Sequence, residues 1–129
     1  MSREVIMARK ILVVDDETDI RAEIAEYIQG KGYEVEAAVD GVEALEKFEA
    51  APADLVITDI RMPRVDGYEV IRRIREIDPR VPIIATTGHY SPTDLNKAKE
   101  AGATLTMKKP IRLRKLGKKL KSLLEADEE

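Results

Sequence analysis

Short apolar segments alternate along the chain with longer segments of helical periodicity, and this alternation limits the folds that the chain can adopt. Residues 11–14, Ile-Leu-Val-Val, form a continuous apolar run of strand length. Such runs are typical of strands buried on both faces of a parallel sheet. Residues 54–58 and 81–85 resemble this run, residues 103–107 do so more weakly, and residues 33–37 alternate as a more exposed strand does. The sequence therefore predicts five strands.

The segments between these strands carry apolar residues at helical spacing and begin or end at recognisable caps. Asp40 and Asp66 are each followed three residues later by a glutamate, which is the pattern of a capping box. Ser91 precedes a proline at the first position of a fourth helix, Gly32 marks the end of the first, and the last covers residues 112–125. The helical residues expected to face the core are Ile20, Ile24, Tyr27, Ile28, Val42, Leu45, Phe48, Val70, Ile71, Ile74, Ile77, Leu113, Leu116, Leu120, Leu123 and Leu124.

Five strands that alternate with five helices through short turns predict right-handed crossovers and a parallel sheet covered by helices on both faces. The predicted fold class is α/β, an open doubly wound sandwich. In such sheets, sites form beyond the carboxyl ends of the strands, near the point where the strand order reverses. We expect residues 1–9 to be a flexible lead-in, residues 10–125 to form one domain and residues 126–129 to form an acidic tail.

Composition excludes several classes of function. The chain has 129 residues, which suits one domain, and it has no cysteine, so disulfides, thiolate zinc sites and cysteine nucleophiles are ruled out. No apolar run is long enough to span a membrane, so we expect a cytoplasmic protein without a membrane partner. The lysines and arginines of residues 108–121 could bind nucleic acid or an acidic partner. Without a helix-turn-helix pattern or interleaved aromatic residues, we expect a protein partner instead.

Polar residues follow the predicted strands at the edge of the sheet where a site is expected. Asp15 and Asp16 follow the first strand, Asp59 the third, Thr87 the fourth and Lys109 the fifth. Each alone has an ordinary explanation, such as capping a helix or hydrogen bonding to a loop. Together they place clustered carboxylates beside a hydroxyl and a lysine, and hard oxygen ligands of this kind suit Mg²⁺. An ionised aspartate in such a site can attack phosphorus without a general base and form an acyl phosphate.

These residues resemble the receiver domains of two-component response regulators, and the resemblance extends from residue 10 to about residue 124. Four motifs carry it, in an order and at a spacing similar to those of the family. They are Val13-Val14-Asp15-Asp16, Asp59-Ile-Arg-Met-Pro63 with Asp66-Gly67, Thr87-Gly88, and Lys109-Pro110.

The resemblance implies a flavodoxin-like fold with five parallel strands in the order 2-1-3-4-5. It implies a switch rather than a turnover enzyme, which accepts a phosphoryl group on Asp59 from a histidine kinase or a phosphotransfer protein and then acts on a downstream protein target. The implied site consists of Asp15, Asp16, Asp59 and the backbone carbonyl of Arg61 around Mg²⁺, of Thr87 and Lys109 on the phosphoryl oxygens, and of a cis bond before Pro110.

The sequence departs from the family at Thr106, where receivers usually carry a tyrosine or phenylalanine that turns inward on phosphorylation. A phosphoryl group can still bias a two-state equilibrium without that ring. Arg61 and His89 flank the site and are expected to tune the lifetime of the acyl phosphate, although His89 is equally well explained as a polar loop residue. Tyr90 is more simply an incidental loop residue than a substitute for the ring.

Three other functions share some of these sequence features with the phosphorylated switch. A haloacid-dehalogenase-like phosphatase also uses an aspartate nucleophile, but its general acid should stand two residues later, where this chain has Arg61. A flavodoxin-like phosphate-binding module is disfavoured by the acidic run at residues 15–17, which would repel phosphate. A receiver-like module that signals by contact alone is favoured by Thr106 and disfavoured by the complete set of acidic residues.

Overall fold

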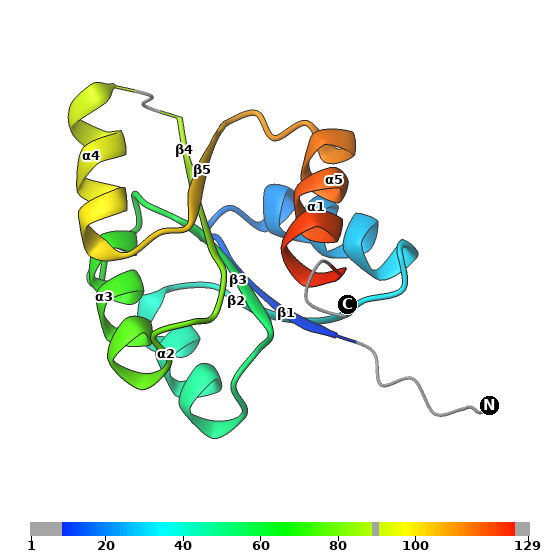
Figure 1. Cartoon of the computed structure of the whole chain (residues 1–129), viewed down its shortest axis with the longest axis horizontal. Helices are drawn as coiled ribbons and strands as arrows, with labels where there is room; N and C mark the ends of the chain where they lie inside the picture. The colour runs from blue at the N-terminus through cyan, green and yellow to red at the C-terminus, as the bar shows by residue number, and fades with distance from the viewer. Residues whose placement is uncertain (1–8, 89–90, 126–129) are drawn as a thin grey trace.

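A computed structural model describes residues 9–88 and 91–125, in which strands and helices alternate (Figure 1). The strands are β1 (Lys10–Val14), β2 (Glu34–Ala38), β3 (Leu55–Asp59), β4 (Ile83–Thr87) and β5 (Leu105–Lys108). The helices are α1 (Thr18–Gly30), α2 (Gly41–Ala50), α3 (Gly67–Ile77), α4 (Pro92–Ala101) and α5 (Leu113–Glu125). All four strand pairs are parallel and the order is β2-β1-β3-β4-β5, which confirms the predicted doubly wound fold.

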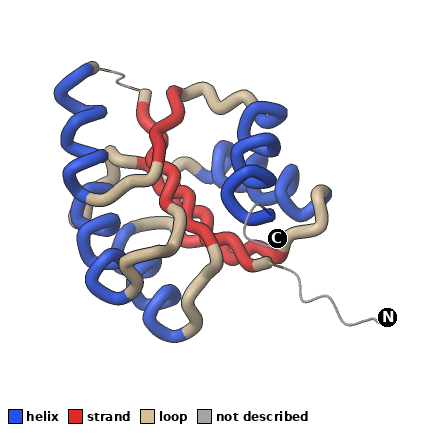
Figure 2. Tube along the Cα trace, viewed as in Figure 1, coloured by secondary structure: helices blue, strands red, loops and turns tan. Residues whose placement is uncertain are grey.

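Helices cover both faces of the sheet, with α1 and α5 on one face and α2, α3 and α4 on the other (Figure 2). Each face has its own apolar cluster, and successive residues of β1 belong to different clusters. Leu12 packs with the cluster that includes Phe48 of α2, whereas Val13 packs with the cluster that includes Leu116 of α5. Because side chains alternate across a strand, a strand covered on both sides needs an uninterrupted apolar run.

The strands begin one or two residues later than four of the five predicted segments. β4 starts at Ile83 instead of residue 81, because the preceding Pro82 has no backbone N–H to donate to a neighbouring strand. At the other end, Asp59 and Thr87 are the last residues of β3 and β4. The two polar side chains are therefore held by strand backbone instead of by the loops that follow.

The predicted helix starts are confirmed by side-chain caps. Asp40 accepts a hydrogen bond from the backbone N–H of Glu43 at 2.9 Å, and the Glu43 carboxylate accepts one from the N–H of Val39 at 2.7 Å. Asp66 and Ser91 cap α3 and α4 in the same way, through the backbone N–H groups three residues on, at 3.0 and 3.1 Å. These local bonds define where each helix begins.

Two residues predicted to face the core lie at the surface. Val42 is 43% exposed, because the face of α2 that packs inward carries Gly41, Ala44 and Phe48, and Val42 is rotated by about 100° from Gly41. Ile77 is 41% exposed, because it is the last residue of α3 and no further helical turn follows to cover it.

Among the described residues, no helix is both long and apolar enough to cross a membrane.

The guanidinium of Arg75 connects the C-terminal end of α3, through hydrogen bonds, to the segments that precede β4 and β5. It donates to the backbone carbonyls of Val81 at 2.6 Å, Gly102 at 2.9 Å and Asp78 at 3.3 Å, and to the hydroxyl of Thr104 at 3.3 Å. The partial burial of this side chain lowers the pKa of its guanidinium. Arg75 thus joins three separate segments at the edge of the sheet opposite the carboxyl ends.

We expect Arg75→Met to lower the free energy of unfolding by roughly 2–4 kcal/mol, because it removes charged hydrogen bonds and leaves partly buried carbonyls without a donor. Urea unfolding followed by circular dichroism measures this. Arg72→Met on the exposed face of the same helix is the matched control and should change stability by less than about 1 kcal/mol. Equal effects of the two substitutions would contradict a special role for Arg75.

Candidate functional site

The carboxyl ends of four parallel strands meet at one edge of the sheet and bring together the polar residues predicted to form a site. Asp15 directly follows β1, while Asp59 and Thr87 end β3 and β4. These three side chains are almost completely buried, with exposed fractions of 2%, 5% and 1%. A buried carboxylate is unusual in a protein of this size unless it has a partner.

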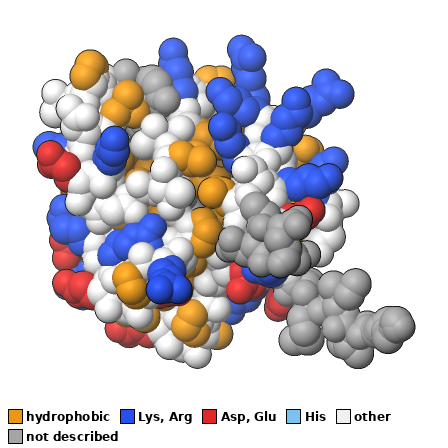
Figure 3. All heavy atoms as spheres, viewed as in Figure 1, with side chains coloured by type: hydrophobic (Ala, Val, Ile, Leu, Met, Phe, Trp, Pro, Cys, Tyr) orange, Lys and Arg blue, Asp and Glu red, His pale blue; other side chains and the backbone are white. Residues whose placement is uncertain are grey.

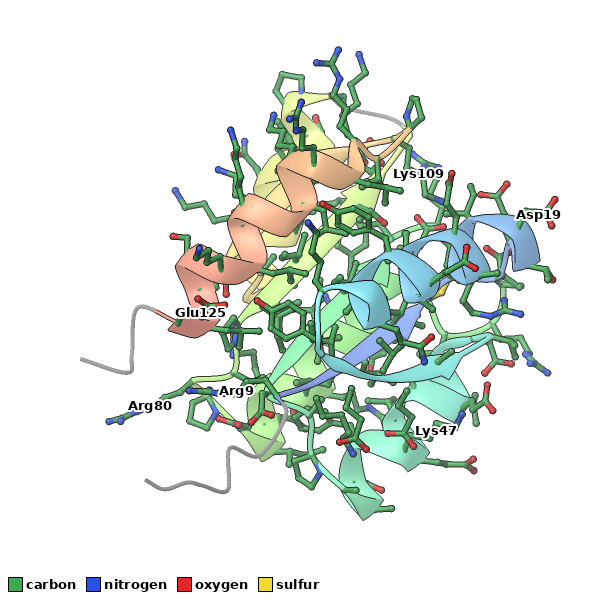
Figure 4. All side chains as sticks on the ribbon, turned by 90° about the vertical axis from the view of Figure 1, so that its right-hand side faces the viewer. Arg9, Asp19, Lys47, Arg80, Lys109 and Glu125 are labelled. Carbon is green, nitrogen blue, oxygen red and sulfur yellow. The ribbon has the colours of Figure 1, made fainter. Side chains whose placement is uncertain are left out.

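Lys109, which directly follows β5, is the partner of these buried carboxylates. It contacts residues that follow β1 and the residue that ends β3. Its ammonium Nζ lies 3.0 Å from Asp59 Oδ2, 3.1 Å from Asp15 Oδ2 and 3.1 Å from Glu17 Oε1. The backbone N–H of Lys109 donates to the carbonyl of Thr87 at 2.8 Å, and the bond from Lys109 to Pro110 is cis, as the resemblance implied. In Figure 4, Lys109 lies at the same end of the molecule as Asp19, which is in the first turn of α1.

Burial and pairing act in opposite directions on the two central groups. Burial raises the pKa of Asp59, and the hydrogen bond and charge of Lys109 offset only part of that rise. For Lys109, burial alone would lower the pKa, but the hydrogen bonds to Asp59 and Asp15 outweigh it and raise the pKa of the ammonium. Lys109 is therefore fully protonated at neutral pH. The site holds one cation against three carboxylates and keeps an excess of negative charge.

The carboxylates form a candidate metal site whose members differ in part from the predicted ligands. Among the described residues, ligand oxygens of Asp15, Glu17 and Asp59 all lie within 4.8 Å of one another. Asp16, the predicted ligand, is exposed and is not in this group. Glu17 joins it because its backbone N–H donates to Asp15 Oδ1 at 2.9 Å, which turns the chain back toward the site. An all-oxygen, negatively charged donor set fits a hard divalent cation.

The start of α1 also shows that Asp16 does not take the simpler role of helix cap. The residue at the N-cap position is Glu17, and it makes no side-chain capping bond. The loop is held instead by Arg21, whose guanidinium donates to the backbone carbonyl of Asp15 at 2.8 Å. The carboxylates after β1 therefore do not cap α1 and remain available to the site.

The start of α3 lies directly against the backbone of Asp59, and a glycine makes this approach possible. A Cβ atom on Gly67 would lie 2.2 Å from the carbonyl oxygen of Asp59 and 2.5 Å from Cα of Ile60. The backbone N–H of Gly67 donates to the carbonyl of Ile60 at 2.7 Å. The pair Asp66-Gly67 therefore has a physical reason in this chain, because the first residue caps α3 and the second lets α3 reach the site.

Arg61, expected to flank the site, points its side chain toward α4. Its backbone N–H lies 3.4 Å from Asp59 Oδ1, but its guanidinium Nη2 lies 3.5 Å from Asp94 Oδ2. Tyr68 of α3 donates its hydroxyl to the other oxygen of Asp94 at 3.2 Å. Asp94 thus connects the loop after Asp59 to the first turn of α4. The sequence offered no signal for this connection, since the residues are separated by at least 26 positions.

The remaining predicted positions are only partly described. Thr106 is half-buried in β5 and lines a hollow beside Lys109 and Pro110. His89, expected to tune the site, lies outside the described residues, as does Tyr90. The tuning roles of Arg61 and His89 stay predictions.

Comparisons with known proteins agree with this geometry. A model of the response regulator receiver domain family matches residues 11–121. The response regulator MprA of Mycobacterium ulcerans (strain Agy99) is 37% identical over 118 residues, which are 92% of this chain and 51% of that protein. MprA of Mycobacterium tuberculosis (strain ATCC 25618 / H37Rv) is 36% identical over the same length. The chain spans about half the length of these curated relatives.

Solved structures give the same result. The chemotaxis protein CheY4 of Vibrio cholerae superposes with a TM-score of 0.87 at 37% identity, covering 92% of this chain and 100% of that one. A CheY-like receiver domain protein of Methanospirillum hungatei JF-1 superposes with a TM-score of 0.90 at 32% identity, covering 95% and 98%. The chain belongs to the response regulator receiver domain family, whose members are phosphoacceptor switches of two-component signalling and not classical enzymes.

We expect Asp59→Asn to stabilise the metal-free protein at neutral pH. Folding raises the pKa of Asp59, so the folded state binds this proton more tightly than the unfolded state does. Ionised Asp59 therefore costs stability above the raised pKa, and this cost disappears as the pH falls below the ordinary value of 3.8. Urea unfolding in EDTA between about pH 7 and pH 4 should show a gain that shrinks toward the acid end.

The matched control for this measurement is Glu49→Gln, which removes an exposed carboxylate from α2 and should leave the pH dependence unchanged. A stability difference between Asp59→Asn and the unsubstituted protein that is constant over the whole pH range would contradict the raised pKa.

We expect Gly67→Ala to destabilise the protein by roughly 2–4 kcal/mol, because the new methyl group would overlap backbone atoms that cannot move without displacing Asp59. Thermal or urea unfolding measures this. Gly30→Ala is the matched control: a Cβ there meets nothing within 4 Å, and alanine in a helix should raise stability by up to about 1 kcal/mol. A Gly67→Ala protein as stable as the control would show that α3 can withdraw from Asp59.

Proposed function

We propose that this chain is a phosphorylation-controlled receiver that accepts a phosphoryl group on Asp59 from a histidine kinase or a phosphotransfer protein, in a reaction that needs Mg²⁺. The observation that carries the proposal is the contact of 3.0 Å between Lys109 Nζ and Asp59 Oδ2 within a buried cluster of carboxylates. The receiver unit is proposed to be residues 10–125, which the family match over residues 11–121 supports.

Asp59 is the proposed nucleophile. One of its carboxylate oxygens attacks the phosphorus of a phosphorylated histidine, an O–P bond forms and the N–P bond breaks. The imidazole then leaves with a proton from solvent. Because a carboxylate attacks in its ionised form, the reaction needs no general base. Lys109 places its positive charge beside the attacking group and stabilises the charge that develops on the phosphoryl oxygens. Thr87, at the end of the neighbouring strand, is the proposed hydroxyl donor to one of these oxygens.

The carboxylates are proposed to hold Mg²⁺. Asp15, Asp16 and Asp59 with the backbone carbonyl of Arg61 are the ligands that the resemblance implies, and Glu17 is close enough to take part or to compete. When bound, Mg²⁺ offsets the negative charge of the carboxylates and of the incoming phosphoryl group. Three carboxylates against one lysine leave the charge imbalance that such a cation would correct.

Phosphorylation is proposed to change the affinity for a downstream protein by shifting an existing equilibrium. A phosphoryl group on Asp59 would take Lys109 away from its present carboxylate partners, and the backbone of Lys109 continues into the loop that leads to α5. On the other side, the link from Arg61 to Asp94 joins the site to α4. Two arrangements of α4 and α5 suffice for a switch, with or without a ring at the position of Thr106.

The test is phosphorylation by acetyl phosphate with Mg²⁺, followed by intact-protein mass spectrometry. We expect one phosphoryl group on the unsubstituted chain and none on Asp59→Asn or in EDTA, because the first removes the nucleophile and the second the cation. Asp54→Asn, at the residue directly before the same strand, is the matched control and should be phosphorylated normally. Label that does not depend on Asp59 would falsify the assignment. A protein that is never labelled, with beryllofluoride also without effect, would favour signalling by contact alone.

A further inference from the structure

Helices α1 and α5 pack side by side on one face of the sheet, and a hollow of about 330 Å³ opens between them. Two tyrosines, four basic residues, one glycine and one glutamate line it. In Figure 4 the glutamate, Glu125, lies at the end of α5 that is farther from Lys109. No residue of the carboxylate cluster around Asp59 belongs to the wall. We call this space the α1–α5 hollow.

The aromatic part of the wall depends on Gly117, in the middle of α5. A Cβ atom on Gly117 would lie 2.8 Å from the hydroxyl oxygen of Tyr27 and 3.4 Å from Cε2 of its ring. The φ angle of Gly117 is outside the left-handed region, so the backbone there does not require glycine. Glycine inside a helix is less stable than alanine. Its effect here is to let the ring of Tyr27 reach α5 and form part of the wall.

Two of the four tyrosines of the chain line this hollow. Tyr27 and Tyr33 are both half-buried, so each ring is packed against the protein and still partly accessible. The ammonium of Lys31, which directly follows α1, lies 5.4 Å from the centroid of the Tyr27 ring. Aromatic rings held in this way offer a surface on which a planar ring can stack.

Basic side chains approach the same hollow from two helices. Arg114, Lys118 and Lys121 follow one another at spacings of four and three, which places them on one face of α5, and Lys31 comes from the end of α1. In Figure 3, lysine and arginine side chains project together from the upper right of the molecule, where Figure 1 places α5. Four cations face one carboxylate, that of Glu125. This imbalance favours a ligand with several negative charges.

The carboxylate of Glu125 makes the two ends of the hollow chemically different. One of its oxygens accepts a hydrogen bond from the hydroxyl of Tyr33 at 3.1 Å, which holds the carboxylate in place. A carboxylate repels a plain phosphate, but it accepts hydrogen bonds from the hydroxyl groups of a sugar. The wall therefore suits a molecule that is anionic at one end and carries hydroxyl groups and a ring toward the other.

We infer that the α1–α5 hollow binds a ribonucleotide that carries two or more phosphate groups. The base stacks on the accessible part of a tyrosine ring, a ribose hydroxyl donates to Glu125, and the phosphates pair with Arg114 and Lys118. A hollow of 330 Å³ has the size of sites that hold small ligands, which is on the order of 300–1,000 Å³. The inference uses no residue of the proposed phosphorylation site and does not rest on that function.

The experiment titrates the chain with ADP and, separately, with GDP in EDTA, and follows amide chemical shifts. EDTA prevents a metal ion from linking the phosphates to the carboxylates around Asp59. We expect saturable shifts at Lys31, Tyr33 and Gly117 with at least one of the two nucleotides. Inorganic pyrophosphate should bind roughly tenfold or more weakly, because it has no ring to stack and no hydroxyl for Glu125.

The cationic part of the wall is tested by Arg114→Gln/Lys118→Gln. We expect the dissociation constant of the nucleotide to rise roughly tenfold or more, because charged hydrogen bonds to the phosphates are lost. The matched control is Lys97→Gln/Lys99→Gln, which makes the same change in net charge on α4, on the other face of the sheet. It should alter the constant by less than about twofold.

The aromatic part is tested by Gly117→Ala, whose added methyl group would displace the tip of Tyr27. We expect nucleotide binding to weaken roughly fivefold or more. Gly30→Ala is the matched control, since a Cβ there meets nothing within 4 Å, and it should leave binding unchanged. Circular dichroism verifies folding, and Tyr27→Leu gives the same test if Gly117→Ala does not fold.

Several results would overturn the inference. They are the absence of saturable shifts with both nucleotides, shifts located away from the hollow, pyrophosphate binding as tight as nucleotide binding, and equal effects of a variant and its control. The Asp59→Asn protein should bind the nucleotide as the unsubstituted protein does, and loss of binding in this variant would also count against the hollow. If the unsubstituted protein binds the nucleotide but is never phosphorylated, the proposed function fails alone.

Discussion

The contact of the Lys109 ammonium with two buried carboxylates is the interaction on which the rest of the site depends. Asp15 and Asp59 are almost completely shielded from solvent, and ionised groups in such positions require a compensating charge. Lys109 provides it at 3.1 and 3.0 Å, but one cation does not balance three carboxylates. The remaining negative charge and the burial that raises the pKa of Asp59 make the site unfavourable as it stands. This imbalance favours binding of the divalent cation and the phosphoryl group that we propose for the site.

The two sides of the site differ in how firmly they are held. On one side, α3 is fixed by its buried apolar face, by the approach of Gly67 to Asp59 and by the carbonyl bonds of Arg75. On the other, α4 buries only Ala98 and Ala101, and its first turn is linked to the site by Asp94. An arrangement of this kind keeps Asp59, the proposed nucleophile, in place while neighbouring elements can move. A switch needs both properties.

Acidic and basic residues are concentrated in different parts of the chain. The acidic segments surround the end of the sheet where a cation is expected, whereas the basic segments gather on β5 and α5. Lys109 stands between the two and belongs to both. The same lysine therefore connects Asp59 to the segment that leads into α5.

The sequence by itself determined the features that depend on neighbours along the chain. Apolar runs identified the strands, and Asp40, Asp66 and Ser91 identified three helix starts through bonds to residues three positions away. Convergence of Asp15, Asp59, Thr87 and Lys109 was also predictable, because parallel strands end at one edge. Only the tertiary structure decided that Glu17 turns into the carboxylate cluster while Asp16 faces solvent, that Val42 and Ile77 are exposed, and that Arg61 pairs with Asp94. These outcomes depend on which distant segments pack beside a side chain. The periodicity of a single segment does not specify those tertiary neighbours.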